Sequence, residues 1–147
     1  MFTSELIGNY RFMVEIDYML VAGFSEVSGI QIETEIEEYR EGGVNEYVHK
    51  LVKGTRHVPL VLKRGISSYE LWNWYWEVLE GNIIRRSGAI ILFDHNYEEY
   101  RRWTFDGAYP VKWVGPELKA NVSEIAIEQI ELVHNGFKID DRDRDRY

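Results

Sequence analysis

The feature that most constrains the fold is a run in which apolar and acidic residues alternate. Ile30, Ile32, Thr34 and Ile36 occupy one set of positions, and Gln31, Glu33, Glu35 and Glu37 occupy the other. Because successive side chains of a β-strand point to opposite faces, this alternation predicts an amphipathic strand with a ladder of carboxylates. Carboxylates two residues apart on a strand lie about 6.6 to 6.8 Å apart, so the ladder requires water or opposing cations.

The segment after this strand lacks a clear period. Residues 40–56 carry charges of both signs and are interrupted by Gly42, Gly43 and Gly54. We interpret them as a long loop or a loosely paired hairpin arm. Unstructured connections longer than about 12 residues are usually functional or disordered in compact domains.

Several other runs have the character of strands. Residues 10–16 alternate in the same way, and residues 19–29 form an apolar run whose glycines indicate a bend or bulge. Pro59 precedes the run that ends in "LKRG", which places the start of that strand at an edge or a bulge. Four further strand-like runs follow: "AIILFD", "EYRRWTF", "AYPVKWVG" and "SEIAIEQIELVH".

One helix is expected over residues 67–80. Ser67 and Glu70 have the spacing of a capping box, and Gly81 supplies a stop. An apolar stripe at helical spacing, flanked by Trp72, Trp76 and Leu79, is expected to pack on the core. Its members are Leu71, Trp74, Tyr75 and Val78.

Together these elements predict a mainly β protein, a barrel or sandwich of about eight strands with one flanking helix. We expect a single domain over residues 1–137, since a chain of 147 residues is close to the commonest domain size. The end of the chain, residues 138–147, is strongly charged and is expected to be a solvated, flexible tail.

Composition excludes several classes of function. The formal net charge of −8 argues against general affinity for nucleic acid, and no sequence-specific nucleic-acid binding is expected. The absence of cysteine excludes disulfides and thiolate metal sites. The sequence has neither an apolar run of spanning length nor a signal-peptide pattern, so we expect a soluble protein made in the cytoplasm, without membrane insertion.

Candidate catalytic groups are few. The four histidines have no metal-binding spacing, and Asp94 with His95 is more typical of a turn than of an acid–base site. Glu33, Glu35 and Glu37 could serve a carboxylate-dependent hydrolase, but catalysis requires carboxylates in unlike environments. No phosphate-binding or nucleophile motif is present, so we expect no enzyme activity and no cofactor or metal. A β-barrel module that binds an apolar ligand between helix and sheet is the alternative from another class.

A series of motifs resembles the tail tube (inner tube) family of contractile phage tails and related injection systems. The resemblance covers roughly residues 9–136, and its most specific parts are "GFSEVSG", "EYREGG" and "LKRG" in combination. The sequence departs from the family at Tyr18 and Tyr97, where a turn glycine is common.

The resemblance implies a subunit that forms homohexameric rings, which stack into a tube inside a contractile sheath and above a baseplate. DNA or protein effectors would pass along the bore of the virion tail or injection particle. Alternatively, the subunit could form a specialised initiator or terminator ring next to the baseplate and not the repeated ring of the tube.

In such a ring, Glu33, Glu35 and Glu37 are the candidates for residues that face the lumen. The segment from 40 to 56 is the candidate for an arm that reaches the next subunit, because it is long and of mixed charge. Its candidate residues are Arg40, Glu41, Gly42, Gly43, Asn45, Lys50, Lys53, Gly54 and Arg56.

Overall fold

A computed structural model of the protein describes residues 11–17, 24–39, 49–65 and 69–139. The described part contains nine strands and one helix. The strands are β1 (Arg11–Ile16), β2 (Phe24–Ser28), β3 (Ile32–Tyr39), β4 (His49–His57), β5 (Leu60–Gly65), β6 (Arg86–Phe93), β7 (Glu99–Val114), β8 (Ile127–Val133) and β9 (Phe137–Ile139). The helix is α1 (Glu70–Leu79). The predicted fold class, mainly β with one flanking helix, is confirmed.

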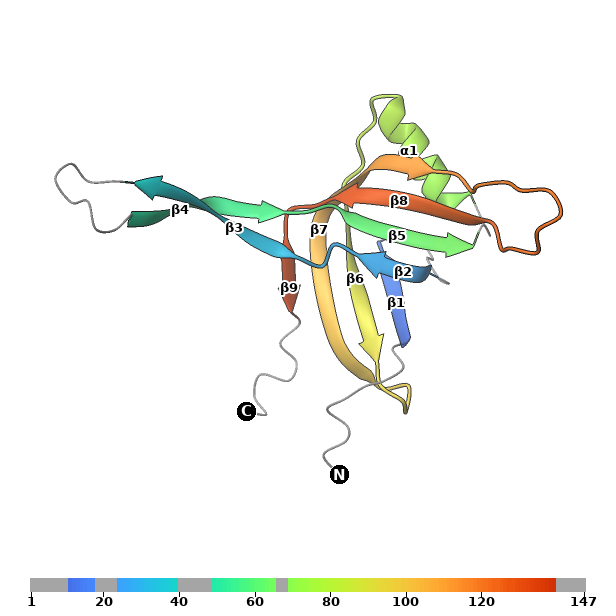
Figure 1. The fold of residues 1–147 in the computed structure, drawn as a ribbon, viewed down its shortest axis with the longest axis horizontal. Helices are drawn as coiled ribbons and strands as arrows, with labels where there is room; N and C mark the ends of the chain where they lie inside the picture. Colours follow the sequence, from blue (N-terminus) through green and yellow to red (C-terminus); the bar gives the residue numbers. More distant parts are fainter. Residues whose placement is uncertain (1–10, 18–23, 40–48, 66–68, 140–147) are drawn as a thin grey trace.

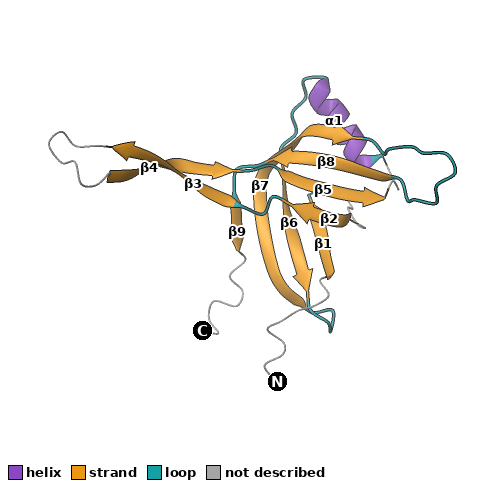
Figure 2. Cartoon of the chain, viewed as in Figure 1, coloured by secondary structure: helices purple, strands orange, loops and turns teal. Residues whose placement is uncertain are grey.

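Seven strands form one antiparallel sheet, which curves around the core (Figure 1). Their order is β1-β6-β7-β8-β5-β2, with β9 beside β7. Strands β3 and β4 form a separate two-stranded sheet that extends away from this body. Figure 2 shows α1 on one side of the body and the loop over residues 115–126 at the end opposite the β3–β4 hairpin.

Strand β7 is the element that joins the two halves of the body. Its first half pairs with β6 and β9, and its second half pairs with β8. The sequence predicted two separate strands here, over residues 99–105 and 108–115. That prediction is wrong, because Gly107 adopts φ of 62° within the strand and lets the backbone continue instead of ending it.

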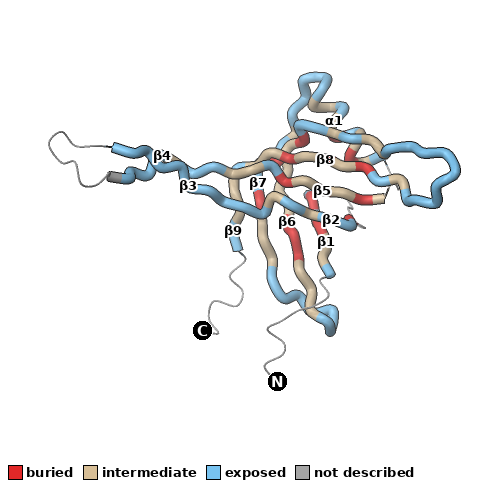
Figure 3. Tube along the Cα trace, in the orientation of Figure 1, coloured by how far each residue is buried: buried red, intermediate tan, exposed pale blue. Residues whose placement is uncertain are grey.

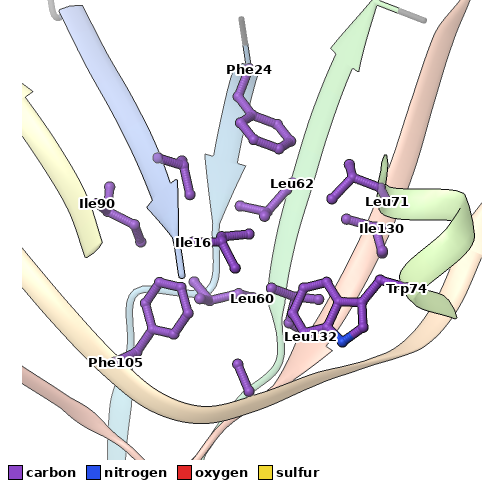
Figure 4. Packing of buried hydrophobic residues seen from close by; sticks show 12 residues of the cluster. Ile16, Phe24, Leu60, Leu62, Leu71, Trp74, Ile90, Phe105, Ile130 and Leu132 are labelled. Carbon is purple, nitrogen blue, oxygen red and sulfur yellow. The ribbon is translucent and has the colours of Figure 1, made fainter. Parts of the chain in front are cut away.

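The core lies between the sheet and α1 (Figure 4). The alternation predicted in the first strand appears directly, since Val14 and Ile16 of β1 are buried and Glu15 is exposed. The buried cluster also takes side chains from β2, β5, β6, β7, β8 and α1. Among its members are Phe24, Leu60, Leu62, Leu71, Trp74, Ile90, Phe105, Ile130 and Leu132.

The end of α1 agrees with the sequence pattern, and its start does not. Asn82 N–H donates to the Glu77 carbonyl and Gly81 N–H donates to the Val78 carbonyl, with Gly81 at φ of 90°. These bonds form a Schellman stop. The helix begins at Glu70 and not at residue 67, and Tyr69 before it provides no side-chain cap. Ser67 itself lies outside the described residues.

The last described strand corrects the predicted domain boundary. β9 runs to Ile139 and pairs with β7 through Trp103↔Ile139 and Thr104↔Lys138. Residues 138 and 139 therefore belong to the sheet and not to a tail, and residues 140–147 lie outside the described part. No helix among the described residues is long and apolar enough to cross a membrane.

Candidate assembly surfaces

The β3–β4 hairpin, residues 32–39 and 49–57, is an arm that projects from the body (Figure 1). Every residue of β3 is exposed, as are most of the described side chains of β4 (Figure 3). A two-stranded hairpin is marginally stable by itself in water. An arm of this length with no core beneath it therefore has surface available for contacts with other molecules.

The register of the arm places the acidic ladder on one face. Glu33 pairs with Arg56, Glu35 with Gly54 and Glu37 with Leu51. A bulge between Glu35 and Ile36 leaves one extra residue on β4 at this point. Arg56 therefore stands opposite the ladder at its end nearest the body, and Lys53, the extra residue of β4, lines the same surface hollow as Glu33 and Glu35.

The opposite face of the arm carries three exposed apolar side chains, together with the Thr34–Thr55 and Glu38–Lys50 pairs. Ile36 pairs with Val52, and Ile32 lies on the same face nearer the body. These side chains are 55%, 76% and 56% exposed, respectively. The alternation in the sequence thus marks a strand whose apolar face is not covered by the body of this chain.

Of the two interpretations of residues 40–56, the described part agrees with the paired hairpin arm and not with the long loop. Lys50, Lys53, Gly54 and Arg56 lie in β4, which is paired along its length with β3. The segment lacks hydrophobic periodicity because neither of its faces packs on a core, although its backbone is fully capable of pairing. The other candidates, Arg40, Glu41, Gly42, Gly43 and Asn45, lie outside the described residues.

Gly29 and Pro59 form the junction between the arm and the body. On the body side Ser28 pairs with Val61, and on the arm side Ile32 pairs with His57. The β2–β5 pair and the β3–β4 pair are therefore successive parts of one long hairpin. Between them, Gly29 has φ of 92°, and a Cβ there would lie 2.1 Å from the Pro59 carbonyl oxygen. Only glycine fits this junction without displacing the opposite backbone.

Two histidines lie at the root of the arm. His134 Nε2 is 3.1 Å from the Val58 carbonyl oxygen, and Gly136 N–H donates to His134 Nδ1 at 3.0 Å. This arrangement requires a neutral ring that carries its proton on Nε2. Burial lowers the pKa of His134, and the His57 ring, whose centroid is 5.5 Å away, lowers it further. The Val58 carbonyl and Asp106 oppose these effects.

A buried ion pair fixes the middle of the body. Arg64 Nε donates to Glu128 Oε1 at 2.8 Å, and both side chains are almost inaccessible. The second oxygen of Glu128 accepts a hydrogen bond from Trp113 Nε1 at 3.1 Å. In the sequence, Arg64 stands out only as part of "LKRG", and Glu128 belongs to no motif. A charged residue inside the apolar alternation of residues 123–134 was the available signal.

The apolar stripe of α1 is directed at the sheet. Leu71 and Trp74 are buried in the core, and Tyr75 and Val78 are partly buried (Figure 4). Trp74 Nε1 donates to the Ile84 carbonyl at 2.9 Å, which satisfies its polar atom.

The residues considered for catalysis are not brought together. Glu33, Glu35 and Glu37 are spread along the exposed arm, and Asp94 Oδ1 accepts backbone N–H groups of Asn96 and Glu98 in a turn. Within the described ranges, no three His, Cys, Asp or Glu side chains are grouped as for a metal ion.

The body has a cleft of about 510 Å³ between β1, β6, β7 and the turn before β9, away from α1. Arg102 on its wall contacts Glu99 at 2.6 Å and Glu15 at 3.4 Å. The hydrogen bond with Glu99 is the main cause that raises the pKa of Arg102. This cleft does not lie at the place where the binding-module alternative put its ligand, between helix and sheet.

Comparison with known families settles the class of protein. Residues 8–138 match the T4-like virus tail tube protein gp19 family. The chain belongs to this family. It is a structural subunit of the tube of a contractile phage tail or a phage-tail-like injection system. The family is one of structural proteins and not of enzymes.

Solved structures share the fold of this tube subunit. A chain of the anti-feeding prophage (AFP) tube-terminating cap is 25% identical, with a TM-score of 0.81 and coverage of 92% of this chain and 91% of that chain. A chain of the PVC sheath–tube complex in the extended state, an extracellular contractile injection system, is 24% identical, with a TM-score of 0.80 and the same coverage. A chain of the 6-fold symmetrised AFP baseplate is 24% identical, with a TM-score of 0.73 and coverage of 89% and 93%. A search of curated proteins found no significant match.

Proposed function

We propose that six copies of this subunit close into a ring, that rings stack into a tube, and that the β3–β4 arm joins neighbouring subunits. The observation that carries the proposal is the group of apolar side chains on one face of the arm, Ile32, Ile36 and Val52, each more than half exposed. A single subunit leaves this face in water, whereas a neighbouring subunit that covers it would gain hydrophobic stabilisation.

The edges of the body sheet support ring closure. In the described part, β1 and β2 end the main strand order and have one strand neighbour each. Unprotected edges favour pairing with another chain, and head-to-tail contacts between copies close into a ring when the rotation permits. The six-fold symmetry of the AFP baseplate structure, which contains a chain of this fold, supports six as the number of copies.

We further propose that the face with Glu33, Glu35 and Glu37 lines the bore. An acidic wall repels polyanionic cargo such as DNA and acidic proteins at short range, within about 8 Å at physiological salt. Cargo would then pass without adhering to the wall.

The partners proposed for the tube are a sheath and a baseplate, because chains of this fold occur in the PVC sheath–tube complex and the AFP baseplate. The subunit would be made in the bacterial cytoplasm and assembled into the virion tail or injection particle. A specialised ring at the baseplate or at the tube end is distinguished from the repeated subunit by its copy number in the particle.

The experiment is removal of the arm. Residues 34–55 are replaced by Asn-Gly, a dipeptide that favours a tight hairpin turn between Glu33 and Arg56. We expect the body to keep its circular dichroism spectrum and the wild-type protein to form rings or tubes in electron micrographs and native mass spectra. The shortened protein should remain monomeric. Normal tubes from the shortened protein would refute the role of the arm, and a wild-type chain that stays monomeric with its sheath and baseplate partners would refute ring formation.

A further inference from the structure

One imidazole joins the root of the arm to the body. His134 lies directly after β8, in the turn that leads to β9, and its Nε2–H donates to the carbonyl of Val58, the residue that follows β4. Its Nδ1 accepts the Gly136 N–H at 3.0 Å. Because both nitrogens belong to one rigid ring, the side chain cannot turn away from Gly136 without also leaving Val58. The neutral ring therefore holds the turn and the arm root together.

A second histidine packs against the same turn. The centroids of the His57 and His134 rings are 5.5 Å apart, and a Cβ on Gly136 would lie 3.1 Å from His57 Nε2. The backbone of Gly136 therefore lies directly against the His57 ring at the end of β4. His57 Nδ1 is buried and has no hydrogen-bond partner among the described residues. The arm root thus gains support from the turn that His134 holds.

Aromatic rings pack on the imidazole of His134. The centroid of the Phe137 ring lies 4.4 Å from that of His134, and the centroid of the Phe105 ring lies 6.5 Å from it. A charged imidazolium is poorly solvated in this half-buried place, and burial is the main cause that lowers the pKa of His134. The folded chain therefore favours the neutral ring, which is the form that accepts the Gly136 N–H.

Neighbouring elements bring further titratable groups to this place. His57 of β4 lowers the pKa of His134, whereas the Val58 carbonyl and Asp106 of β7 raise it. His57, Gly136 and Asp106 also line the cleft of about 510 Å³ in the body, so water reaches the turn without unfolding of the sheet. The other charged residues of the cleft are Glu15, Asp17, Arg102 and Lys138.

We propose that His134 is a pH-sensitive switch for the arm, which is held in place while the imidazole is neutral and released when the imidazole is doubly protonated. The second proton occupies Nδ1, which then faces the Gly136 N–H as one donor against another. The ring has to leave the turn, so the Val58 carbonyl loses its partner and the His57 ring loses its support. The consequence rests on the proposed function: rings should form at neutral pH and come apart in acid.

The test follows the arm in single subunits. The chain contains no cysteine, so Lys50→Cys on the arm and Glu98→Cys in the β6–β7 turn provide two unique sites for a pair of fluorescent dyes. Single-molecule energy transfer at subnanomolar concentration, which keeps subunits apart, reports the position of the arm. We expect a narrow distribution of transfer efficiency at neutral pH and a broad one at about pH 5, a range in which histidine is the side chain that ordinarily changes charge. The same distribution at both pH values overturns the proposal.

Two substitutions of His134 separate its hydrogen bonds from its charge. The amide of His134→Gln can accept from Gly136 and donate to Val58 at any pH, so the arm should stay in place in acid. His134→Phe keeps a ring among the aromatic side chains but makes neither bond, so the arm should be released at both pH values. A glutamine variant that is released in acid as the wild type is, or a phenylalanine variant that holds its arm, overturns the proposal. If a variant fails to fold by circular dichroism, the titration of the wild type decides.

The two neighbours should move the midpoint of arm release in opposite directions. His57→Gln removes a group that lowers the pKa of His134, so release should occur at higher pH than in the wild type. Asp106→Asn removes a carboxylate that raises the pKa of His134, so release should require lower pH. Midpoints that move in the same direction, or that do not move, would assign the transition to another group and overturn the proposal.

Ring formation connects the switch to assembly. In electron micrographs the wild type should form rings at neutral pH and lose them in acid, whereas His134→Gln should form rings under both conditions. Wild-type rings that persist in acid, although the arm of single subunits is released, would overturn the proposal. A wild type without rings at either pH would count against the proposed function alone, because the titration of single subunits still decides whether His134 controls the arm.

Discussion

Trp74 is the residue through which α1 is fixed to the sheet. It is 2% exposed and its indole nitrogen is satisfied by the Ile84 carbonyl. Trp74→Ala removes a large buried side chain and should lower the free energy of unfolding by about 3 to 5 kcal/mol. Chemical denaturation of the two proteins measures this difference. Trp76→Ala, on the exposed side of the same helix, should cost much less, and similar losses for both would contradict the assignment of the buried stripe.

Glu128 has a different role, because its charge is buried. Glu128→Gln keeps the shape of the side chain but removes the carboxylate charge that Arg64 contacts at 2.8 Å. Breaking a buried ion pair by removing one charge typically costs about 3 to 5 kcal/mol. We expect a loss of this order in denaturation experiments. The double variant Arg64→Met with Glu128→Leu should be less destabilised than the sum of its two single variants, because neither charge is left unpaired. A double variant that loses more stability than this sum would contradict the role of the ion pair.

His134 makes the stability of the arm root depend on pH. Burial lowers the pKa of the His134 imidazole in the folded protein. As the pH falls below about 6.5, the ordinary pKa of histidine, the unfolded chain therefore takes up a proton more readily than the folded chain does. The contribution of the neutral His134 side chain to the stability of the fold is complete above about pH 6.5, and it is lost as the pH falls toward the pKa of His134 in the folded protein. His134→Gln should therefore flatten the dependence of the melting temperature between pH 7 and pH 5. A His134→Gln protein whose melting temperature depends on pH as strongly as that of the wild type would contradict this role of His134.

At the scale of elements, the sequence predicted those parts that its local pattern determines. The alternation in β1 and the glycine stop of α1 depend on near neighbours, and both appear in the structure. The sequence predicts two strands in place of β7, because a glycine between two apolar runs usually indicates a turn. In the structure, pairing with β6, β8 and β9 keeps the strand continuous through Gly107. The contact between Arg64 and Glu128 depends on strand order, which no local pattern contains.

The arm illustrates the same limit. β4 lacks a core face, so the periodicity that normally reveals a strand is absent. The sequence therefore left a loop and a paired hairpin arm open, and the pairing with β3 decides between them. The glycines of residues 19–29 indicate a bend or bulge in the sequence, but the close approach of Gly29 to Pro59 is evident only in three dimensions.

Gly29→Ala tests this junction as an element. The alanine side chain disfavours a φ of 92°, at a cost of about 1 to 2 kcal/mol, and its Cβ would meet the Pro59 carbonyl. We expect the direction of the arm to change, with reduced ring formation and a modest loss of thermal stability. Gly54→Ala is the control for thermal stability alone, because a Cβ there meets nothing within 4 Å of this chain. Normal assembly of a folded Gly29→Ala protein would show that the direction of the arm is not set at this residue.

At the scale of the whole molecule, charge is the property that the proposed tube would multiply. Each subunit carries a formal net charge of −8, and three of its carboxylates lie in the ladder of β3. Exchange of Glu33, Glu35 and Glu37 for glutamine keeps the size and hydrogen-bonding capacity of these side chains but removes three negative charges per subunit. A ring of six copies would lose about eighteen charges in the bore, which relieves repulsion between like charges.

The triple glutamine variant should therefore fold and form tubes at least as readily as the wild type, and the difference should lie in cargo. Because the acidic wall would no longer repel polyanions, DNA or an acidic protein should be retained in the tube, and this retention should decrease at high salt. Circular dichroism, electron microscopy and a cargo-release assay measure the three properties separately. Conversion of Glu117 and Glu124 to glutamine in the loop at the opposite end of the body is the control for charge loss alone. Equal cargo retention by both variants, or a triple variant that cannot fold, would place the ladder somewhere other than the bore.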